Sequence, residues 1–238
     1  MDPKERFLSG GPEKDSPASL LRDVDRLVHK LRTPLNSLSL NADLLGSVSQ
    51  AKPGKEALFA RALKSLQTEV ARLDKIAGDF QRYVSVGLGE PEPIPMADVL
   101  RTAIAQAGES GEPRGIARID PKFPESLPSV HGDPPLLAQA LIELIHNAHE
   151  INEEGRVVVE AGADGSSVWV DVTDSGPGVE YDDPQKIFEL FLGGKQGHLG
   201  FGLTYARRIA RMHGGELDLR QTSPKGATFR LTLPIAKK

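Results

Sequence analysis

The chain reads DVTDSGPGVE at residues 171–180, directly after a run of alternating apolar residues. The pattern predicts a hydrophobic strand that ends at Asp174, whose carboxylate is a hydrogen-bond acceptor. Gly176 and Gly178 follow at once, and residues without a side chain let another backbone or a ligand approach closely. We therefore expect a binding site where this strand ends.

A second glycine-rich stretch, GKQGHLGFGLTYARRIARMHGG, occupies residues 194–215. It runs a loop straight into an amphipathic helix. Gly200 and Gly202 leave amide groups free at the start of that helix, where the helix dipole favours a phosphate. Read alone, such glycines can equally be ordinary turns.

Helical and strand patterns are grouped around these stretches. Helical spacing of apolar residues recurs at 96–108, 135–150 and 202–213. Strand patterns recur at 116–120, 156–160, 167–174, 216–222 and 227–234. In the last strand Ala227 and Phe229 share one face and Thr228 lies on the other. Strands in hairpins with helices between them predict an α/β sandwich with a mixed, mainly antiparallel sheet, not a doubly wound parallel one.

The first third of the chain carries two long helical patterns separated by the turn AKPGK at 51–55. The apolar stripe of the first is Leu20, Val24, Leu27, Leu31, Leu38 and Leu45; that of the second is Leu63, Leu66, Val70, Leu73, Ala77, Phe80 and Val84. An isolated hairpin cannot bury both stripes, so we predict a homodimer in which two hairpins form a four-helix bundle. The alternative is that the hairpin packs against the rest of its own chain.

These patterns predict an α+β, multidomain protein. The Pro/Gly-rich segment GLGEPEPIP at 87–95 marks the main boundary. The expected regions are a flexible arm at 1–16, a helical hairpin at 17–88, a linker at 89–95 and a catalytic domain at 96–238.

Composition excludes several classes of function. The 238 residues carry a net charge of −4, which does not favour a nucleic-acid partner. The absence of cysteine excludes disulfides and thiolate metal sites. No apolar run reaches the ~20 residues of a membrane helix. We expect a cytoplasmic protein without a direct membrane span, whose signal input comes from a partner protein or a missing sensor region.

The first candidate for chemistry is His29 in VHKLRTPLNSL, residues 28–38. It lies beside the apolar stripe of the first helix, and Pro34 is expected to kink that helix just after it. An imidazole presented on the surface of a bundle suits a nucleophile that two partners reach in turn. A surface histidine near an incidental proline is the alternative.

The second candidate is LIELIHNAHEI, residues 141–151, a helix that presents Glu143 and Asn147 on one face. Oxygen ligands of this kind can hold Mg²⁺. His146 and His149 superficially resemble a zinc site on the same helix, which we consider the weaker interpretation.

In this order and spacing the motifs resemble sensor histidine kinases: a dimerisation and phosphoacceptor hairpin, then an ATPase domain of the gyrase–Hsp90–histidine kinase–MutL superfamily. The resemblance implies ATP and Mg²⁺ as cofactors, with His29 as phosphoacceptor and Thr33 and Pro34 at the end of its motif. Asn147 and Glu143 would hold the metal, and Asp174 the adenine amino group. The segment 182–199 resembles the ATP lid. The implied nucleotide-contacting residues are Glu143, Asn147, Asp174, Gly176, Gly178, Lys195, His198, Leu199, Gly200, Gly202 and Thr228.

The sequence departs from the family pattern beside the nucleophile. The family usually has an acid after the phosphoacceptor, where this chain has Lys30. A lysine cannot accept the imidazole proton while it is charged, so phosphorylation should be slower. Asp25, one helical turn before His29, could compensate. Glu143 stands where the family often has asparagine and raises the possibility of ATP hydrolysis.

The expected function is an ATP-dependent protein histidine kinase that phosphorylates His29 and passes the phosphoryl group to an aspartate of a response-regulator receiver domain. The main alternative is a histidine phosphotransfer or phosphatase protein with weak or no kinase activity. A non-catalytic dimeric scaffold and an ATP-driven clamp are the others.

Overall fold

The computed structural model describes residues 17–49, 56–89, 91–109, 118–151, 155–179, 184–190 and 200–236. The chain divides into two compact units at Val86 and Gly87. The arm predicted at 1–16 and the turn predicted at 51–55 lie outside the described residues.

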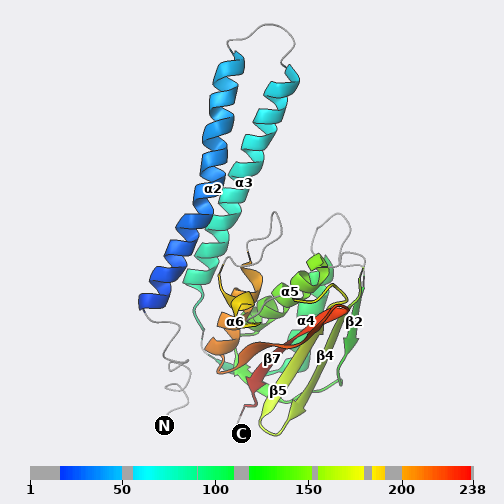
Figure 1. Cartoon of the computed structure of the whole chain (residues 1–238). Coiled ribbons are helices and arrows are strands. Elements are labelled where there is room, and N and C mark those ends of the chain that lie inside the picture. Colours follow the sequence, from blue (N-terminus) through cyan, green and yellow to red (C-terminus); the bar gives the residue numbers. More distant parts are fainter. Residues whose placement is uncertain are drawn as a thin grey trace. The chain divides into compact units, whose positions relative to one another are not determined.

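The first unit is a hairpin of two long helices, α2 (Pro17–Ser49) and α3 (Glu56–Ser85), which pack along each other (Figure 1). Ala62, Ile76 and Tyr83 of α3 are buried. Helix α2 continues through Pro34, whose ring is buried. Polar contacts also join the two helices, because the side-chain amide of Asn41 donates to Ser65 Oγ at 3.1 Å and the Tyr83 hydroxyl donates to Asp23 Oδ2 at 3.3 Å.

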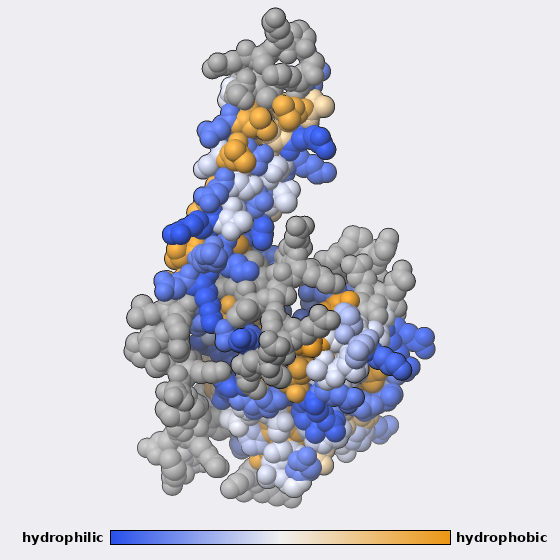
Figure 2. All heavy atoms as spheres, viewed as in Figure 1, coloured by the Kyte–Doolittle hydropathy of each residue, from blue (hydrophilic) through white to orange (hydrophobic). Residues whose placement is uncertain are grey.

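The predicted apolar stripe of α3 divides between two faces. Leu66, Leu73 and Phe80 are half-buried, as expected for a face that meets α2. The other members lie on the neighbouring face and are exposed, at seven-residue spacing: Leu63, Val70, Ala77 and Val84. On α2 the exposed apolar side chains are Val24, Val28, Leu35 and Leu40. Apolar side chains are visible on the surface of the hairpin in Figure 2. The hairpin thus buries one apolar seam and leaves a second open to solvent.

The second unit is built on a five-stranded sheet in the order β2 (Ile119–Lys122), β4 (Val157–Asp164), β5 (Ser167–Thr173), β7 (Gly226–Pro234), β6 (Glu216–Ser223). Among the described strands of this sheet, only the β2–β4 pair is parallel. A short ribbon pairs β1 (Glu92–Pro95) with β3 (Ser129–Gly132) antiparallel. A 3₁₀ helix, η1, spans Pro184–Phe188.

Helices α4 (Met96–Glu109), α5 (Pro134–Ile151) and α6 (Gly202–Met212) cover one face of this sheet (Figure 1). The core lies between them and the inward strand residues, which include Val159, Val170, Val172, Leu217, Leu231 and Leu233. The opposite face of the sheet is polar, and its buried Asp171 accepts hydrogen bonds from Arg230 and Arg220. The α+β class with a mixed, mainly antiparallel sheet is confirmed.

A buried histidine joins α5 to α6. The ring of His213, which ends α6, is 1% exposed. Its Nε2 accepts the backbone N–H of Asp133 at 3.0 Å, so Nδ1 carries the proton and donates to the Ile209 carbonyl at 2.7 Å. Asp133 in turn caps α5, with its Oδ1 accepting the N–H of Leu136. Burial lowers the pKa of His213, so the ring remains neutral and both bonds persist.

The short strands differ from the sequence prediction, and β3 was not predicted at all. The expected linker at 89–95 contains β1, because Pro93 and Pro95 are tolerated in a two-stranded ribbon. Strand β2 starts at Ile119 and includes Pro121, which is compatible with its place at the edge of the sheet. Among the described helices, none combines the length and apolarity needed to cross a membrane.

Candidate functional site

The site is organised around Asp174, which follows β5 directly and is 3% exposed. Its Oδ1 accepts backbone N–H groups from Gly176 at 2.8 Å and from Ala227 at 3.2 Å. Its own N–H donates to the Ala227 carbonyl at 3.0 Å. The other oxygen, Oδ2, is buried and has no hydrogen-bond partner among the described residues. Burial raises the pKa of this carboxyl despite its backbone hydrogen bonds.

The glycines after Asp174 allow the chain to pass close to its neighbours. A Cβ on Gly176 would lie 2.2 Å from Cγ2 of Ile151, at the end of α5. Gly178 has φ +80°, and a Cβ there would lie 2.1 Å from the Ser223 carbonyl oxygen. These contacts require glycine at both positions and hold the Asp174 loop between α5 and the β6–β7 turn.

Helix α5 brings Glu143 and Asn147 to the same region. Both are half-buried, and Asn147 lies one turn before Ile151, which touches the Asp174 loop. Glu143 Oε1 accepts a hydrogen bond from Gln139 at 3.1 Å. A Cβ on Gly202 would lie 2.9 Å from Glu143 Oε2, so the start of α6 passes against this carboxylate. The carboxamide oxygen of Asn147 and the carboxylate oxygens of Glu143 are suitable ligands for Mg²⁺.

The start of α6 is suited to an anion. Gly200 has φ +64°, and α6 begins at Gly202. Phe201, the N-cap residue, offers no side-chain capping hydrogen bond, so the amides of the first turn are not capped by it. With eleven residues α6 has a full helix dipole to favour negative charge at this end.

Thr228 is not brought to this site. It lies on the outward face of β7, where its hydroxyl is 2.9 Å from that of Thr173. Ala227, one residue earlier, faces the helices and binds Asp174 through its backbone. The strand alternation already pointed to this, because it placed Ala227 on the face of Phe229. Lys195, His198 and Leu199 lie outside the described residues, so they stay predictions.

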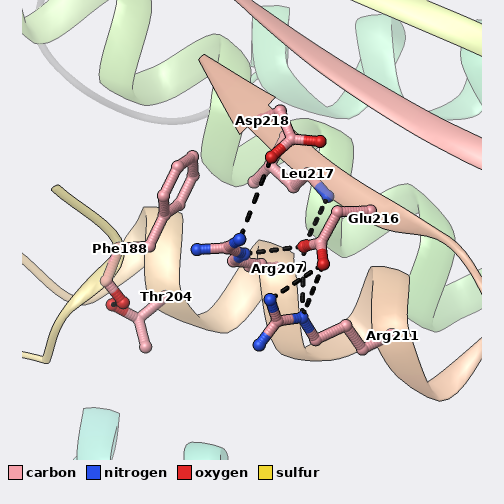
Figure 3. A network of polar contacts seen from close by, with 7 residues as sticks. All are labelled: Phe188, Thr204, Arg207, Arg211, Glu216, Leu217 and Asp218. Carbon is pink, nitrogen blue, oxygen red and sulfur yellow. Dashed lines mark hydrogen bonds and ion pairs between the residues drawn. The ribbon is translucent and has the colours of Figure 1, made fainter. Parts of the chain in front are cut away.

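Arg207 of α6 is a further buried residue of this domain that the helical pattern at 202–213 does not single out. Arg207 is 6% exposed and its guanidinium lies 4.3 Å from the ring centroid of Phe188 (Figure 3). Spacing alone does not distinguish the buried Arg207 from the half-buried Arg208 next to it.

On the hairpin, His29 is exposed and so are Asp25 and Thr33, while Lys30 is half-buried. In the described part of α2, no hydrogen bond joins Asp25 to His29. The imidazole is therefore accessible to a reaction partner.

Comparison with known proteins identifies one family. Residues 132–237 match the family described as histidine kinase-, DNA gyrase B- and HSP90-like ATPase. This chain is 29% identical to the adaptive-response sensory kinase SasA of Trichormus variabilis over 98% of its length, and spans 60% of the length of that relative.

Solved structures agree in fold. Full-length ShkA in complex with AMPPNP has a TM-score of 0.60 and 25% identity, and the match covers 90% of this chain and 46% of ShkA. Histidine kinase ThkA in complex with response regulator TrrA has a TM-score of 0.69 at 22% identity, covering 98% of this chain and 66% of ThkA.

Proposed function

We propose, from the match of residues 132–237 to the histidine kinase-like ATPase family and from the similarity to the sensory kinase SasA, that this chain transfers the γ-phosphoryl group of ATP to a ring nitrogen of His29. In this reaction the nitrogen forms a bond to phosphorus while the bond from phosphorus to the bridging oxygen of ADP breaks. The ring N–H on the other nitrogen must then lose its proton. His29 is exposed, which supports its role as the acceptor.

The observation that carries this proposal is the free oxygen of Asp174. A buried acceptor without a partner is unfavourable unless a ligand supplies the donor. The exocyclic amino group of adenine is a donor of the required kind. Ala227, whose backbone N–H also binds Asp174, contributes a small buried side chain on the helix-covered face of the sheet.

The phosphates would bind at the start of α6, next to Gly200 and Gly202. Asn147 and Glu143 would hold Mg²⁺, which neutralises phosphate charge when it is bound. Lys195, His198 and Leu199 complete the proposed contacts. Thr228 is replaced in this proposal by Ala227, because its side chain points to the other face of the sheet.

We further propose a homodimer and a response-regulator partner. The exposed seam of Leu63, Val70 and Val84 supports the homodimer, because a second hairpin packed against it would bury these side chains. ThkA was solved with a response regulator, which supports transfer from His29 to a receiver aspartate here. We propose that Thr33, which is exposed one turn after His29, assists dephosphorylation of that regulator.

Incubation with γ-labelled ATP tests the proposal. A phosphoramidate on histidine is lost in acid and survives base, whereas phosphoserine behaves in the opposite way. We expect acid-labile label on the native chain and none on His29→Gln, with ATP binding unchanged. Undiminished label on His29→Gln would contradict the acceptor assignment, and ATP hydrolysis without any label would favour a clamp-type ATPase that uses Glu143.

A further inference from the structure

The charged side chain of Arg207 is buried, and it contacts both acidic side chains and an aromatic ring. Its Nε donates to Glu216 Oε1 at 2.6 Å, and its Nη2 lies 3.8 Å from Asp218 Oδ1 (Figure 3). Its Nη1 is buried and has no hydrogen-bond partner among the described residues. Burying a guanidinium with one nitrogen unsatisfied is unfavourable, so ion pairing alone does not explain this position.

Glu216 does not depend on Arg207 for a counter-charge. Arg211, one turn later on α6, donates to Glu216 Oε2 through Nε at 3.0 Å and Nη2 at 2.8 Å. Burial would raise the pKa of Glu216, but the hydrogen bonds from Arg211 and Arg207 outweigh it and lower the pKa. Two arginines thus share one carboxylate, and of these two described residues only Arg207 lies over an aromatic ring.

That ring, Phe188, links α6 to the strand beside Asp174. Arg207 covers one side of it, and Phe229 of β7 meets it edge-on with centroids 6.3 Å apart. The Phe188 carbonyl also accepts the Thr204 hydroxyl at 2.9 Å. Thr204 lies two residues after Gly202, and Phe229 lies two residues after Ala227, which binds Asp174. Phe188 therefore connects the first turn of α6, where the phosphates are proposed to bind, to the strand that contacts Asp174.

We propose that Arg207 is a positioning residue of the nucleotide site. Its guanidinium, oriented by Glu216, holds Phe188 against α6 and thereby fixes where the first turn of α6 presents its amides to the phosphates of ATP. The inference rests on the proposed ATP site and assigns Arg207 a part in it. It predicts that removing the Arg207 guanidinium weakens binding of the phosphates, while adenine remains bound at Asp174.

The test measures two ligands on four variants of the full chain, with ATP affinity by calorimetry and adenosine affinity by NMR titration. Arg207→Met should weaken ATP about tenfold, the scale of a lost cation–π contact in a desolvated site, and change adenosine less than about twofold. Phe188→Leu should do the same. The double variant should be within about twofold of either single variant, because both remove one interaction. The matched control is Arg211→Met, which loses bonds to the same Glu216 but not the ring, and should keep ATP affinity within about twofold.

Equal losses of ATP and adenosine would mean general destabilisation and would overturn the inference. So would an equally large effect of Arg211→Met, or additive losses in the double variant. If Arg207→Met does not fold, the Phe188→Leu comparison decides. A native chain that binds neither ligand would refute the ATP site itself, whereas native binding with an unaffected Arg207→Met refutes only the role of Arg207.

Discussion

Asp174 holds a carboxylate in a buried position, and its raised pKa shows that burial disfavours the charged form. A carboxyl whose pKa is higher in the folded state binds more protons there than in the unfolded chain. Stability therefore falls as pH rises from the ordinary pKa of about 4 through the raised value, and the loss persists at neutral pH. The Oδ2 atom without a partner thus lowers the stability of the nucleotide-free domain and offers an acceptor to a bound ligand.

We predict that Asp174→Asn stabilises the nucleotide-free protein at pH 7 by roughly 1 kcal/mol, because the buried charge is removed while an oxygen remains to accept from Gly176 and Ala227. The ATP affinity of the same variant should fall by about one or two orders of magnitude. The reason is that the side-chain NH₂ group of asparagine and the amino group of adenine are both hydrogen-bond donors. Urea unfolding and calorimetry check the two effects. The stability difference should shrink below about pH 4, where native Asp174 is also protonated; a variant less stable at every pH would contradict this account.

Lys30 is the departure beside the nucleophile, and its effect should be kinetic. We predict that Lys30→Glu speeds single-turnover phosphorylation of His29 at saturating ATP, because it supplies the missing proton acceptor, a contribution of about 10²-fold or more where it is fully realised. Lys30→Met is the matched control, because it removes the cation without adding a base and should give little gain.

Asp25 should matter only in the native background. Asp25→Ala should slow labelling there, although no hydrogen bond joins it to His29 in the described helix. Such bonds often form only with the reaction partner in place. If Lys30→Glu is no faster and Asp25→Ala is neutral, neither residue handles the proton, and Lys30 instead contacts the phosphate or the partner.

The site residues that could be predicted from the sequence are those whose placement follows from backbone chemistry. Asp174, Gly176 and Gly178 were predictable because a strand end followed by glycines has few structural alternatives. The prediction for Thr228 followed the family motif, whereas the two-residue alternation of β7 places its side chain on the face opposite to Ala227 and Phe229. Arg207 was missed because its burial depends on Phe188 and Glu216, which come from other elements and meet it only in the folded domain.

At the scale of elements, the two-helix hairpin was predictable and its two seams were not. Residues three and four apart lie close together on a helix, so one broad stripe in the sequence covered two neighbouring faces of α3. The structure separates them, with Ile76 and Tyr83 facing inward and Leu63, Val70 and Val84 left open. The short β1 and β3, four residues each, gave no recognisable alternation.

We predict that Val70→Glu converts a dimer to monomers while the helices remain folded. Val70 is 56% exposed in the single hairpin, and a symmetric bundle would place both introduced carboxylates in one buried seam. Thr68→Glu is the matched control, because threonine has the shape of valine and Thr68 is exposed on another face of α3. Sedimentation velocity with circular dichroism separates assembly from helix content. A dimer that survives Val70→Glu unchanged would mean that another surface covers this seam.

At the scale of the whole molecule, ATP binding and phosphoryl transfer place different demands on the two units. The proposed nucleotide contacts that the structure describes, such as Asp174, Asn147 and Gly202, lie in the unit that starts at Gly87, whereas His29 belongs to the hairpin. Helix α3 ends at Ser85 and β1 begins at Glu92, so residues 86–91 tether the units over at most about 20 Å. In the proposed reaction ATP binding depends on the described contacts of one unit, and the transfer step requires the tethered units to meet.

We predict that six Gly/Ser residues inserted after Gly87 leave ATP affinity unchanged and slow single-turnover labelling of His29 about two- to threefold. Doubling a flexible connection costs about 0.6 kcal/mol of closure entropy, which gives that modest factor. The same insertion at Gly165, in the exposed β4–β5 turn, lengthens the chain equally without touching the tether and should affect neither measurement. A loss of labelling far beyond tenfold with intact ATP binding would show that residues 86–91 impose a defined orientation on the two units, and a free tether would then be the wrong description.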